Sequence, residues 1–271
     1  MFEPTPAPSA VVAPPPTSRL RAWAQLPFVT GYLLVCLAHA LSILWLAVLP
    51  RYRREPFAFR LCCDPWSWYS TKLFLRPRIR VVGREHLPAA WHGYLYASNH
   101  ESLVDILLLT KEVRRGFLMK RSVLVSPIGW GTYLSGSVAF NRSSKMARAR
   151  ALRQVITMAR RSMSVVVFPE GTFGHADGRL REPHLNLMRQ AWEADLPVVP
   201  LGHAGSRRAV DGQSLPVHRG AELVLVVRPA VMPADYPDAR SFSHACWQEV
   251  VAAVKQARAE LAPGWPYQHD P

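Results

Sequence analysis

Acidic residues are scarce in this sequence. Its 271 residues include 19 Asp and Glu against 33 Lys and Arg, which gives a formal net charge of +14. Such an excess of positive charge needs an anionic partner, and nucleic acid, anionic lipid and phosphorylated substrates all qualify. With 49% hydrophobic residues, the chain can bury a sizeable core, so we expect one main domain with appendages.

Cysteine is scarce as well. The cysteines at positions 36, 62, 63 and 246 show no metal-ligand spacing and no disulfide framework, so we expect buried thiols in a reducing compartment. The sequence also lacks an internal repeat, a G-x-G-x-x-G fingerprint and a P-loop. These absences argue against a disulfide-stabilised domain, a cysteine metal site and a nucleotide-binding loop.

The N-terminal region contains two uncharged stretches of different kinds. Residues 1–18 are rich in proline with almost no charge, which predicts a disordered tail. Residues 26–49 then run for 24 residues without a formal charge. As a helix rising about 1.5 Å per residue they would reach roughly 36 Å, enough to cross a bilayer core of about 30 Å. We therefore predict a membrane-associating segment over residues 19–75.

Three other interpretations of residues 26–49 stay open. Ala38-His39-Ala40 resembles a signal-peptide cleavage site, but the apolar run continues beyond it, which favours retention of the segment. Thr30, Gly31 and His39 also suit a bent, half-inserted hairpin. The third interpretation is an ordinary buried hairpin of helices.

The residues after this run are typical of a lipid headgroup layer. Trp45 is followed by Arg51, Tyr52, Arg53 and Arg54, a combination of aromatic and cationic side chains found at membrane interfaces. The arginines favour the cytoplasmic side for the rest of the chain. We therefore expect a location at the inner cell membrane, with the main domain facing the cytoplasm.

From residue 76 onward, short apolar runs alternate with longer amphipathic ones. Strands are predicted at 78–83, 93–98, 116–120, 137–142, 164–171, 196–203 and 222–231, and helices at 102–113, 143–162 and 241–261. This alternation predicts an α/β fold, a mostly parallel sheet flanked by helices, with an N-terminal membrane-associating helix or helical hairpin. The domain is expected to span residues 76–264, followed by a short tail over 265–271.

Ionisable residues stand at the start of one predicted helix, in the segment S-N-H-E-S-L-V-D at residues 98–105. In a mostly parallel sheet, functional groups gather just beyond the carboxyl ends of strands, where His100 is expected. If the loop folds back over the helix, the carboxylate of Asp105 fixes one imidazole nitrogen and leaves the other as a base. The alternative is a capped helix, with Asn99 or Ser102 as the N-cap and His100 merely hydrogen bonded.

Four blocks occur in a fixed order along the chain: N-H-x4-D at 99–105, GSVAFNR at 136–142, FPEGT at 168–172 and VVPLG at 198–202. In order and spacing they resemble the motifs of the glycerolipid acyltransferases, the family of the 1-acylglycerol-3-phosphate acyltransferases. The resemblance covers roughly residues 78–230. It implies a membrane-bound enzyme that moves an acyl chain from a coenzyme A or acyl carrier protein thioester to a hydroxyl of a lysolipid acceptor.

The resemblance implies a role for residues of the first two blocks. His100 would be the general base and Asp105 the residue that orients it, with no metal or cofactor required. Arg142 matches the arginine that relatives place near the acceptor phosphate, and a guanidinium suits this role because it donates two parallel hydrogen bonds. Lys120, which ends a predicted strand, is a second candidate phosphate contact. The alternative for either cation is a solvated surface charge.

The third block implies acceptor binding by Glu170, Gly171 and Thr172. They follow a predicted strand, where glycine permits close approach of the backbone and a carboxylate accepts hydrogen bonds from hydroxyls or an amine. A simple Pro-Glu-Gly turn is the alternative. The fourth block, VVPLG, either lines the site or belongs to the core.

Two departures from the family pattern bear on the acceptor. The usual block reads FPEGTR, but here Phe173 follows Thr172. Downstream, where many relatives carry Lys and Gly, this chain has His184, Leu185 and Asn186. Both changes remove cations from the expected acceptor pocket. A lysophospholipid diester or a lyso aminolipid, such as lyso-ornithine lipid, is therefore an alternative to lysophosphatidate.

Two functions of other classes compete with acyl transfer. In a lipid esterase or thioesterase the same base would activate water, but the sequence has no G-x-S-x-G elbow. A nucleic-acid-binding protein would gather its charge in one stripe with interleaved aromatics and would have no membrane segment, so we expect no nucleic acid partner. The arginine-rich stretch 146–162 is a solvated face or a contact for anionic headgroups or an acidic carrier protein.

Overall fold

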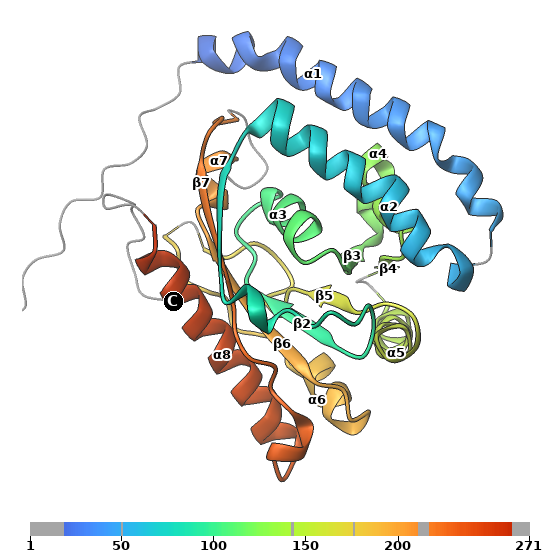
Figure 1. Cartoon of the computed structure of the whole chain (residues 1–271), viewed down its shortest axis with the longest axis vertical. Helices are drawn as coiled ribbons and strands as arrows, with labels where there is room; N and C mark the ends of the chain where they lie inside the picture. Colours follow the sequence, from blue (N-terminus) through green and yellow to red (C-terminus); the bar gives the residue numbers. More distant parts are fainter. Residues whose placement is uncertain (1–18, 50, 142–143, 176, 211–216, 262–271) are drawn as a thin grey trace, which may run out of the picture.

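A seven-stranded sheet in the order β1-β7-β6-β2-β5-β3-β4 forms the centre of the fold (Figure 1). Its strands pair in parallel, apart from β6 and β7, which run antiparallel; this confirms the predicted mostly parallel α/β sheet. The strands are β1 (Arg78–Val82), β2 (Leu95–Ser98), β3 (Gly116–Lys120), β4 (Val138–Phe140), β5 (Val165–Val167), β6 (Val198–Ala204) and β7 (Glu222–Val227).

The computed structural model describes residues 19–49, 51–141, 144–175, 177–210 and 217–261. The expected tails at 1–18 and 265–271 lie outside the described residues, and so does the candidate phosphate ligand Arg142.

The register of the central strands determines where the site forms. β2 lies between β5 and β6, with Tyr96 opposite Val166 on one side and Val199 on the other. Because β2 and β5 run parallel, their carboxyl ends open at the same edge of the sheet. The loop after β2 carries His100 and the loop after β5 carries Glu170, so two blocks that are far apart in sequence meet at this edge.

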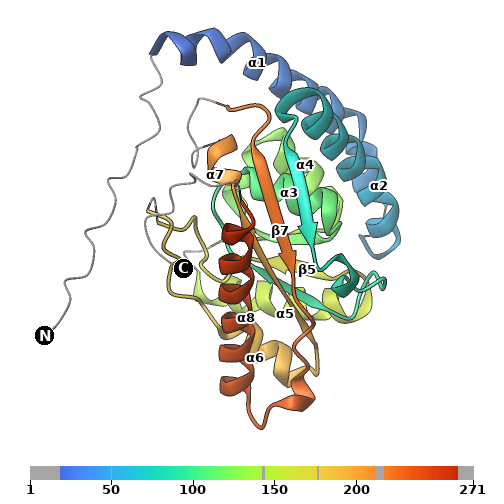
Figure 2. The same cartoon turned by 60° about the vertical axis from the view of Figure 1, so that its left-hand side comes forward.

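Helices cover both faces of the sheet, as Figure 1 and Figure 2 show. Alternate residues of β2 face the two layers: Tyr96 packs into the cluster that contains α3, whereas Leu95 and Ala97 pack into the cluster of α5, α6 and α8. One layer holds α3 (Val104–Glu112) and α7 (Ser206–Ala209), and the other holds α5 (Lys145–Arg161), α6 (Asn186–Glu193) and α8 (Ala239–Ala259). Short 3-10 turns are η3 (Arg84–His86), η4 (Arg121–Val125) and η5 (Pro233–Asp235).

The N-terminal region forms a helical hairpin and not one helix over residues 26–49. α1 (Arg19–Ser42) is followed by the 3-10 turn η1 (Leu44–Val48), and α2 (Arg51–Tyr69) then returns beside α1 and continues as the π-helical turn η2 (Ser70–Leu75) (Figure 1). Ser42 Oγ donates a 2.7 Å hydrogen bond to the carbonyl oxygen of His39, a local bond that competes with further helix. The helical interpretation is therefore correct up to Ser42 and wrong beyond it.

One side of α1 packs on the domain, and the other side is exposed although it is apolar. Cys36 and Ala40 are buried, whereas Leu34 and Leu41 are 59% and 53% exposed. By length and composition, Gln25–Ser42 is long and apolar enough to cross a membrane, and 11% of this stretch is buried. The chain therefore carries an apolar surface on a helix that is already docked on its own domain.

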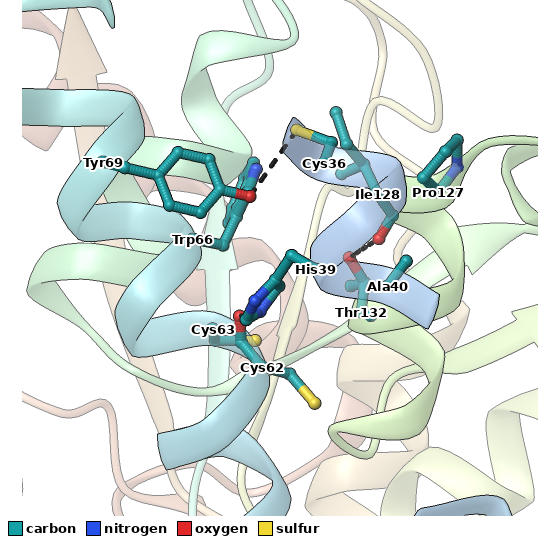
Figure 3. Close-up of a pocket in the computed structure, with 11 residues that line it drawn as sticks. Cys36, His39, Ala40, Cys62, Cys63, Trp66, Tyr69, Pro127, Ile128 and Thr132 are labelled. Carbon is teal, nitrogen blue, oxygen red and sulfur yellow. Dashed lines mark hydrogen bonds between the residues drawn. The ribbon is translucent and has the colours of Figure 1, made fainter. Parts of the chain in front are cut away.

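Side chains of α1, α2 and α4 (Pro127–Leu134) meet at a small pocket, shown in Figure 3. Here His39 Nε2 lies 3.0 Å from the carbonyl oxygen of Cys62, and the Tyr69 hydroxyl donates to Cys36 Sγ at 3.7 Å. The pocket encloses about 20 Å³, room for about one water molecule. The hairpin and the domain are thus closely packed, and all four cysteines are free and buried, as expected.

Candidate functional site

His100 and Asp105 meet at the start of α3. β2 ends at Ser98, and the loop that follows folds back so that His100 Nδ1 lies 2.8 Å from Asp105 Oδ2. The Asp105 side chain is fully buried, and the His100 side chain is 15% exposed. The structure therefore brings His100 and Asp105 together through the folded-back loop that the sequence analysis expected.

The carboxylate of Asp105 also ties down the backbone of the loop. Its Oδ2 accepts the N–H of Glu101 at 2.6 Å and that of Ser102 at 2.9 Å. In addition, Ser102 Oγ accepts the N–H of Val104 at 3.1 Å, a local hydrogen bond just before α3. The N-cap position of α3 is Leu103, which makes no side-chain cap, so neither Asn99 nor Ser102 is the N-cap that the alternative interpretation expected.

The neighbours of Asp105 keep it ionised. Burial alone would raise the pKa of Asp105, but the adjacent His203 and the hydrogen bond from His100 together hold that pKa below its ordinary value. An ionised carboxylate only accepts hydrogen bonds, so His100 Nδ1 carries the hydrogen and donates it. Among the described residues, none hydrogen bonds to His100 Nε2, which leaves this nitrogen available as a proton acceptor.

Glu170 joins the third block to the first. Its Oε1 accepts the N–H of His100 at 2.9 Å, and its Oε2 accepts the N–H of Arg181 at 2.7 Å. The side chain is buried, which raises the pKa of Glu170 to about 7, and the two N–H bonds offset this rise only in part. Glu170 thus holds the loop that carries His100 in position, and acceptor binding by Glu170 stays a prediction.

Gly171 and Thr172 form the turn that follows β5. Gly171 has φ of +68°, a left-handed conformation that favours glycine, and its N–H donates to the carbonyl oxygen of Phe168 at 2.9 Å. Thr172 is half-buried beside it. Both residues directly follow Glu170, which accepts the N–H of His100. Their acceptor-binding role stays a prediction.

Two aromatic rings contact the imidazole of His100. Phe168 stacks on it with ring centroids 4.0 Å apart and planes 15° from parallel. Phe173 contacts it at 4.4 Å with the planes 54° apart. Phe173, the departure from the FPEGTR pattern, thus packs directly against the expected base.

His203 belongs to this site but was missed by sequence reasoning. It lies at the end of β6, fully buried, with Nε2 at 2.9 Å from the carbonyl oxygen of Asn99 and 3.6 Å from Asp105 Oδ2. The Asn99 side chain completes the link, because it accepts the His203 N–H at 2.9 Å and donates to the His203 carbonyl oxygen at 3.0 Å. The only signal in the sequence was a polar residue directly after VVPLG in a buried strand.

Of the two cations expected near the acceptor, Lys120 lies within the described residues. Lys120 is the last residue of β3 and is half-buried at the edge of the sheet where β2 and β5 end. Arg207 is engaged with the protein itself, since its Nη2 donates to the carbonyl oxygen of Gly174 at 3.2 Å. Phosphate binding by Lys120 therefore stays a prediction. Among the residues that the structure describes, no group of three or more His, Cys, Asp or Glu side chains could hold a metal ion.

Comparisons with known proteins agree with these features. The family model described as Acyltransferase matches residues 78–204. A 1-acyl-sn-glycerol-3-phosphate acyltransferase of Chlamydomonas reinhardtii is 27% identical over 234 residues, which is 84% of this chain and 69% of that protein. Chloroplastic enzymes of the same name from Brassica napus and Arabidopsis thaliana are 29% and 28% identical, and the matches span 52% and 46% of their lengths.

The fold is also shared with a solved structure, that of the 1-acyl-sn-glycerophosphate acyltransferase PlsC from Thermotoga maritima. The TM-score is 0.67 at 19% identity, over 90% of this chain and 95% of that one. This likeness concerns the architecture, whereas the family model and the curated relatives concern the sequence. Together the family model and the curated relatives support an acyltransferase of the glycerolipid acyltransferase family, and the solved structure shows that the fold is shared.

Proposed function

We propose that the protein transfers an acyl chain from a thioester, acyl-coenzyme A or acyl carrier protein, to the free hydroxyl of a lysophosphatidate-like lysolipid. The observation that carries the proposal is the pair of His100 Nδ1 and the buried carboxylate of Asp105, 2.8 Å apart. The relatives described above are named for acylation of 1-acyl-sn-glycerol-3-phosphate, which supports this class of acceptor.

The chemistry follows from the free nitrogen of the imidazole. His100 Nε2 accepts the proton of the lysolipid hydroxyl as its oxygen bonds to the thioester carbonyl carbon. The carbon–sulfur bond then breaks, and the proton passes from His100 to the thiolate that leaves. Asp105 stabilises the imidazolium between these two events and fixes the ring orientation. The proposal requires no metal and no cofactor beyond the acyl donor.

Membrane association is the second part of the proposal. Both substrates carry acyl chains, and the exposed apolar face of α1 offers a contact with lipid. Because α1 is docked on the domain and α2 returns beside it, we propose a hairpin that enters one leaflet and does not span the bilayer. The expected location is the inner cell membrane, with the domain on the cytoplasmic side.

An acyl-transfer assay in detergent tests the proposal. Labelled acyl thioester, supplied as the coenzyme A or the carrier-protein form, is offered with lysophosphatidate, with a lysophospholipid diester and with lyso-ornithine lipid. We expect wild type to acylate lysophosphatidate, and both His100→Ala and Asp105→Asn to lower kcat/KM by about 10²–10⁴-fold. The acceptor preferred in this panel also tests whether the loss of cations around Phe173 has shifted the headgroup.

His92→Ala is the matched control, because His92 is an exposed histidine in the loop before β2. This variant should keep the rate of wild type. Activity of His100→Ala equal to that of wild type would remove the proposed base. Release of label only as free fatty acid by wild type would favour the esterase or thioesterase alternative.

A further inference from the structure

The imidazole of His100 contacts two aromatic rings from one loop. Phe168, directly after β5, stacks on the ring at 4.0 Å, and Phe173, five residues later, contacts it at 4.4 Å. The two rings thus give the imidazole apolar neighbours, one stacked on it and one tilted against it. Only 15% of the His100 side chain stays exposed.

Hydrogen bonds hold the backbone of Phe173 and of the next residue, Gly174, in place. Arg181 Nε donates to the carbonyl oxygen of Phe173 at 2.7 Å, and the N–H of Gly174 donates to the carbonyl oxygen of His100 at 2.7 Å. Arg207 adds a hydrogen bond to the carbonyl oxygen of Gly174 at 3.2 Å. The contact of Phe173 with His100 is thus part of a fixed loop and not a chance contact of a surface side chain.

Apolar cover by phenyl rings affects water and a lysolipid hydroxyl differently. An ordered water needs two to four polar partners, and two phenyl rings supply none. A lysolipid hydroxyl is brought to the nitrogen by the binding of its own chain and headgroup, so it does not depend on such partners. Apolar cover over the base therefore disfavours attack by water more than attack by the acceptor.

We propose that Phe173 is a positioning residue that excludes water from His100 and thereby keeps acyl transfer ahead of thioester hydrolysis. The inference rests on the proposed function, because it concerns the choice of nucleophile at the same base. In both reactions an oxygen–carbon bond forms at the thioester carbonyl, the carbon–sulfur bond breaks, and His100 passes the nucleophile's proton to the thiolate. The products are an acylated lysolipid and thiol in one case, and a free fatty acid and thiol in the other.

The test is the ratio of the two products in wild type, Phe173→Ala and Phe173→Leu. Labelled acyl-coenzyme A is incubated with and without lysophosphatidate in detergent, and acylated lysolipid, free fatty acid and thiol are quantified. We expect Phe173→Ala to raise the ratio of hydrolysis to transfer by about tenfold or more, because water gains access to the base. Phe173→Leu, which keeps apolar cover, should stay within about threefold of wild type.

The ratio separates this role from a merely structural one. Both products are formed by the same folded molecules, so a partly unfolded variant lowers both rates without changing their ratio. If Phe173→Ala yields no folded enzyme, Phe173→Val provides the comparison, with a ratio expected between those of Leu and Ala. If Phe173→Ala, or Phe173→Val in its place, had the same ratio of hydrolysis to transfer as wild type at any residual rate, the inference would be overturned. Failure of wild type to acylate any acceptor would instead overturn the proposed function.

Discussion

The pKa values of two buried carboxyl groups of the site differ from their ordinary values in opposite directions. Asp105 accepts hydrogen bonds from an imidazole and two backbone N–H groups, and its pKa lies below the ordinary value. Glu170 accepts only backbone N–H groups, and burial raises its pKa to about 7. Asp105 therefore stays charged as the partner of His100 at neutral pH, whereas Glu170 titrates there.

The titration of Glu170 predicts a pH-dependent stability. A carboxyl with a folded pKa of about 7 and an ordinary value of 4.5 favours its uncharged form in the folded protein. Its contribution is fully present below pH 4.5 and is lost as the pH rises through about 7. We expect the difference in free energy of unfolding between wild type and Glu170→Gln to fall by up to about 3 kcal/mol from pH 5 to pH 8.

Urea unfolding of both proteins at several pH values measures this difference. Glu182→Gln is the control, because Glu182 is an exposed carboxyl in the same loop. This variant should keep the pH dependence of wild type. A difference between wild type and Glu170→Gln that does not vary with pH would contradict the raised pKa.

The residues of the site that stand in sequence motifs could be predicted, whereas His203 and the ring contact of Phe173 could not. His100 and Asp105 stand five positions apart, so the geometry of a loop before a helix was enough to connect them. His203 reaches the same carboxylate from another strand, at a separation that no local pattern reveals. The contact of Phe173 with the base depends on the path of its loop, so the sequence showed only that a cation was missing.

The proposed contact of the α1–α2 hairpin with lipid can be tested on the exposed face of α1. Leu34 and Leu41 lie on the exposed side of α1, at 59% and 53% exposed. We expect Leu34→Gln with Leu41→Gln to leave folding intact and to weaken binding to lipid vesicles by about tenfold or more, because each leucine loses about 1.5–3 kcal/mol of apolar burial in lipid. Vesicle flotation measures the change, and circular dichroism monitors the fold.

Met232→Gln gives the matched control for that measurement. Met232 is also exposed, at 43%, but it lies just before η5, outside the hairpin. Its substitution should leave vesicle binding unchanged. If the hairpin variant bound vesicles as wild type does, the exposed face of α1 would not be the lipid contact.

The elements also show which part of the fold the sequence could reveal. Short strands alternating with amphipathic helices were recognised because their periods differ, and the parallel sheet followed from that alternation. A helical hairpin was one of the expected forms of the N-terminal segment, but the bounds of α2 were not predicted, because Pro56 and Pro65 usually mark helix ends and the segment lacks a clear apolar period. Its helix is stabilised by packing, since Phe59, Cys62 and Cys63 are buried against the domain.

The net charge of the protein and the apolar face of α1 would act on a lipid surface over different distances. In the proposed membrane contact, the net charge of +14 would attract anionic lipid across about a Debye length, roughly 10 Å at 0.1 M salt. Exposed cations on α5, such as Arg153 and Arg160, contribute to this field. The apolar face of α1, in contrast, stabilises the bound state only on contact with the bilayer.

This difference predicts two components of membrane binding that salt can separate. Raising the salt from about 0.05 M to 0.5 M should weaken binding to vesicles rich in anionic lipid by about tenfold or more, because screening shortens the reach of the charge. Binding to neutral vesicles should change little over the same range, since it depends on the apolar face of α1. In the Leu34→Gln, Leu41→Gln variant the salt-resistant part should fall while the salt-sensitive part persists. An equal response of both vesicle types to salt would exclude a role for the net charge, and complete release at high salt would exclude insertion of the hairpin.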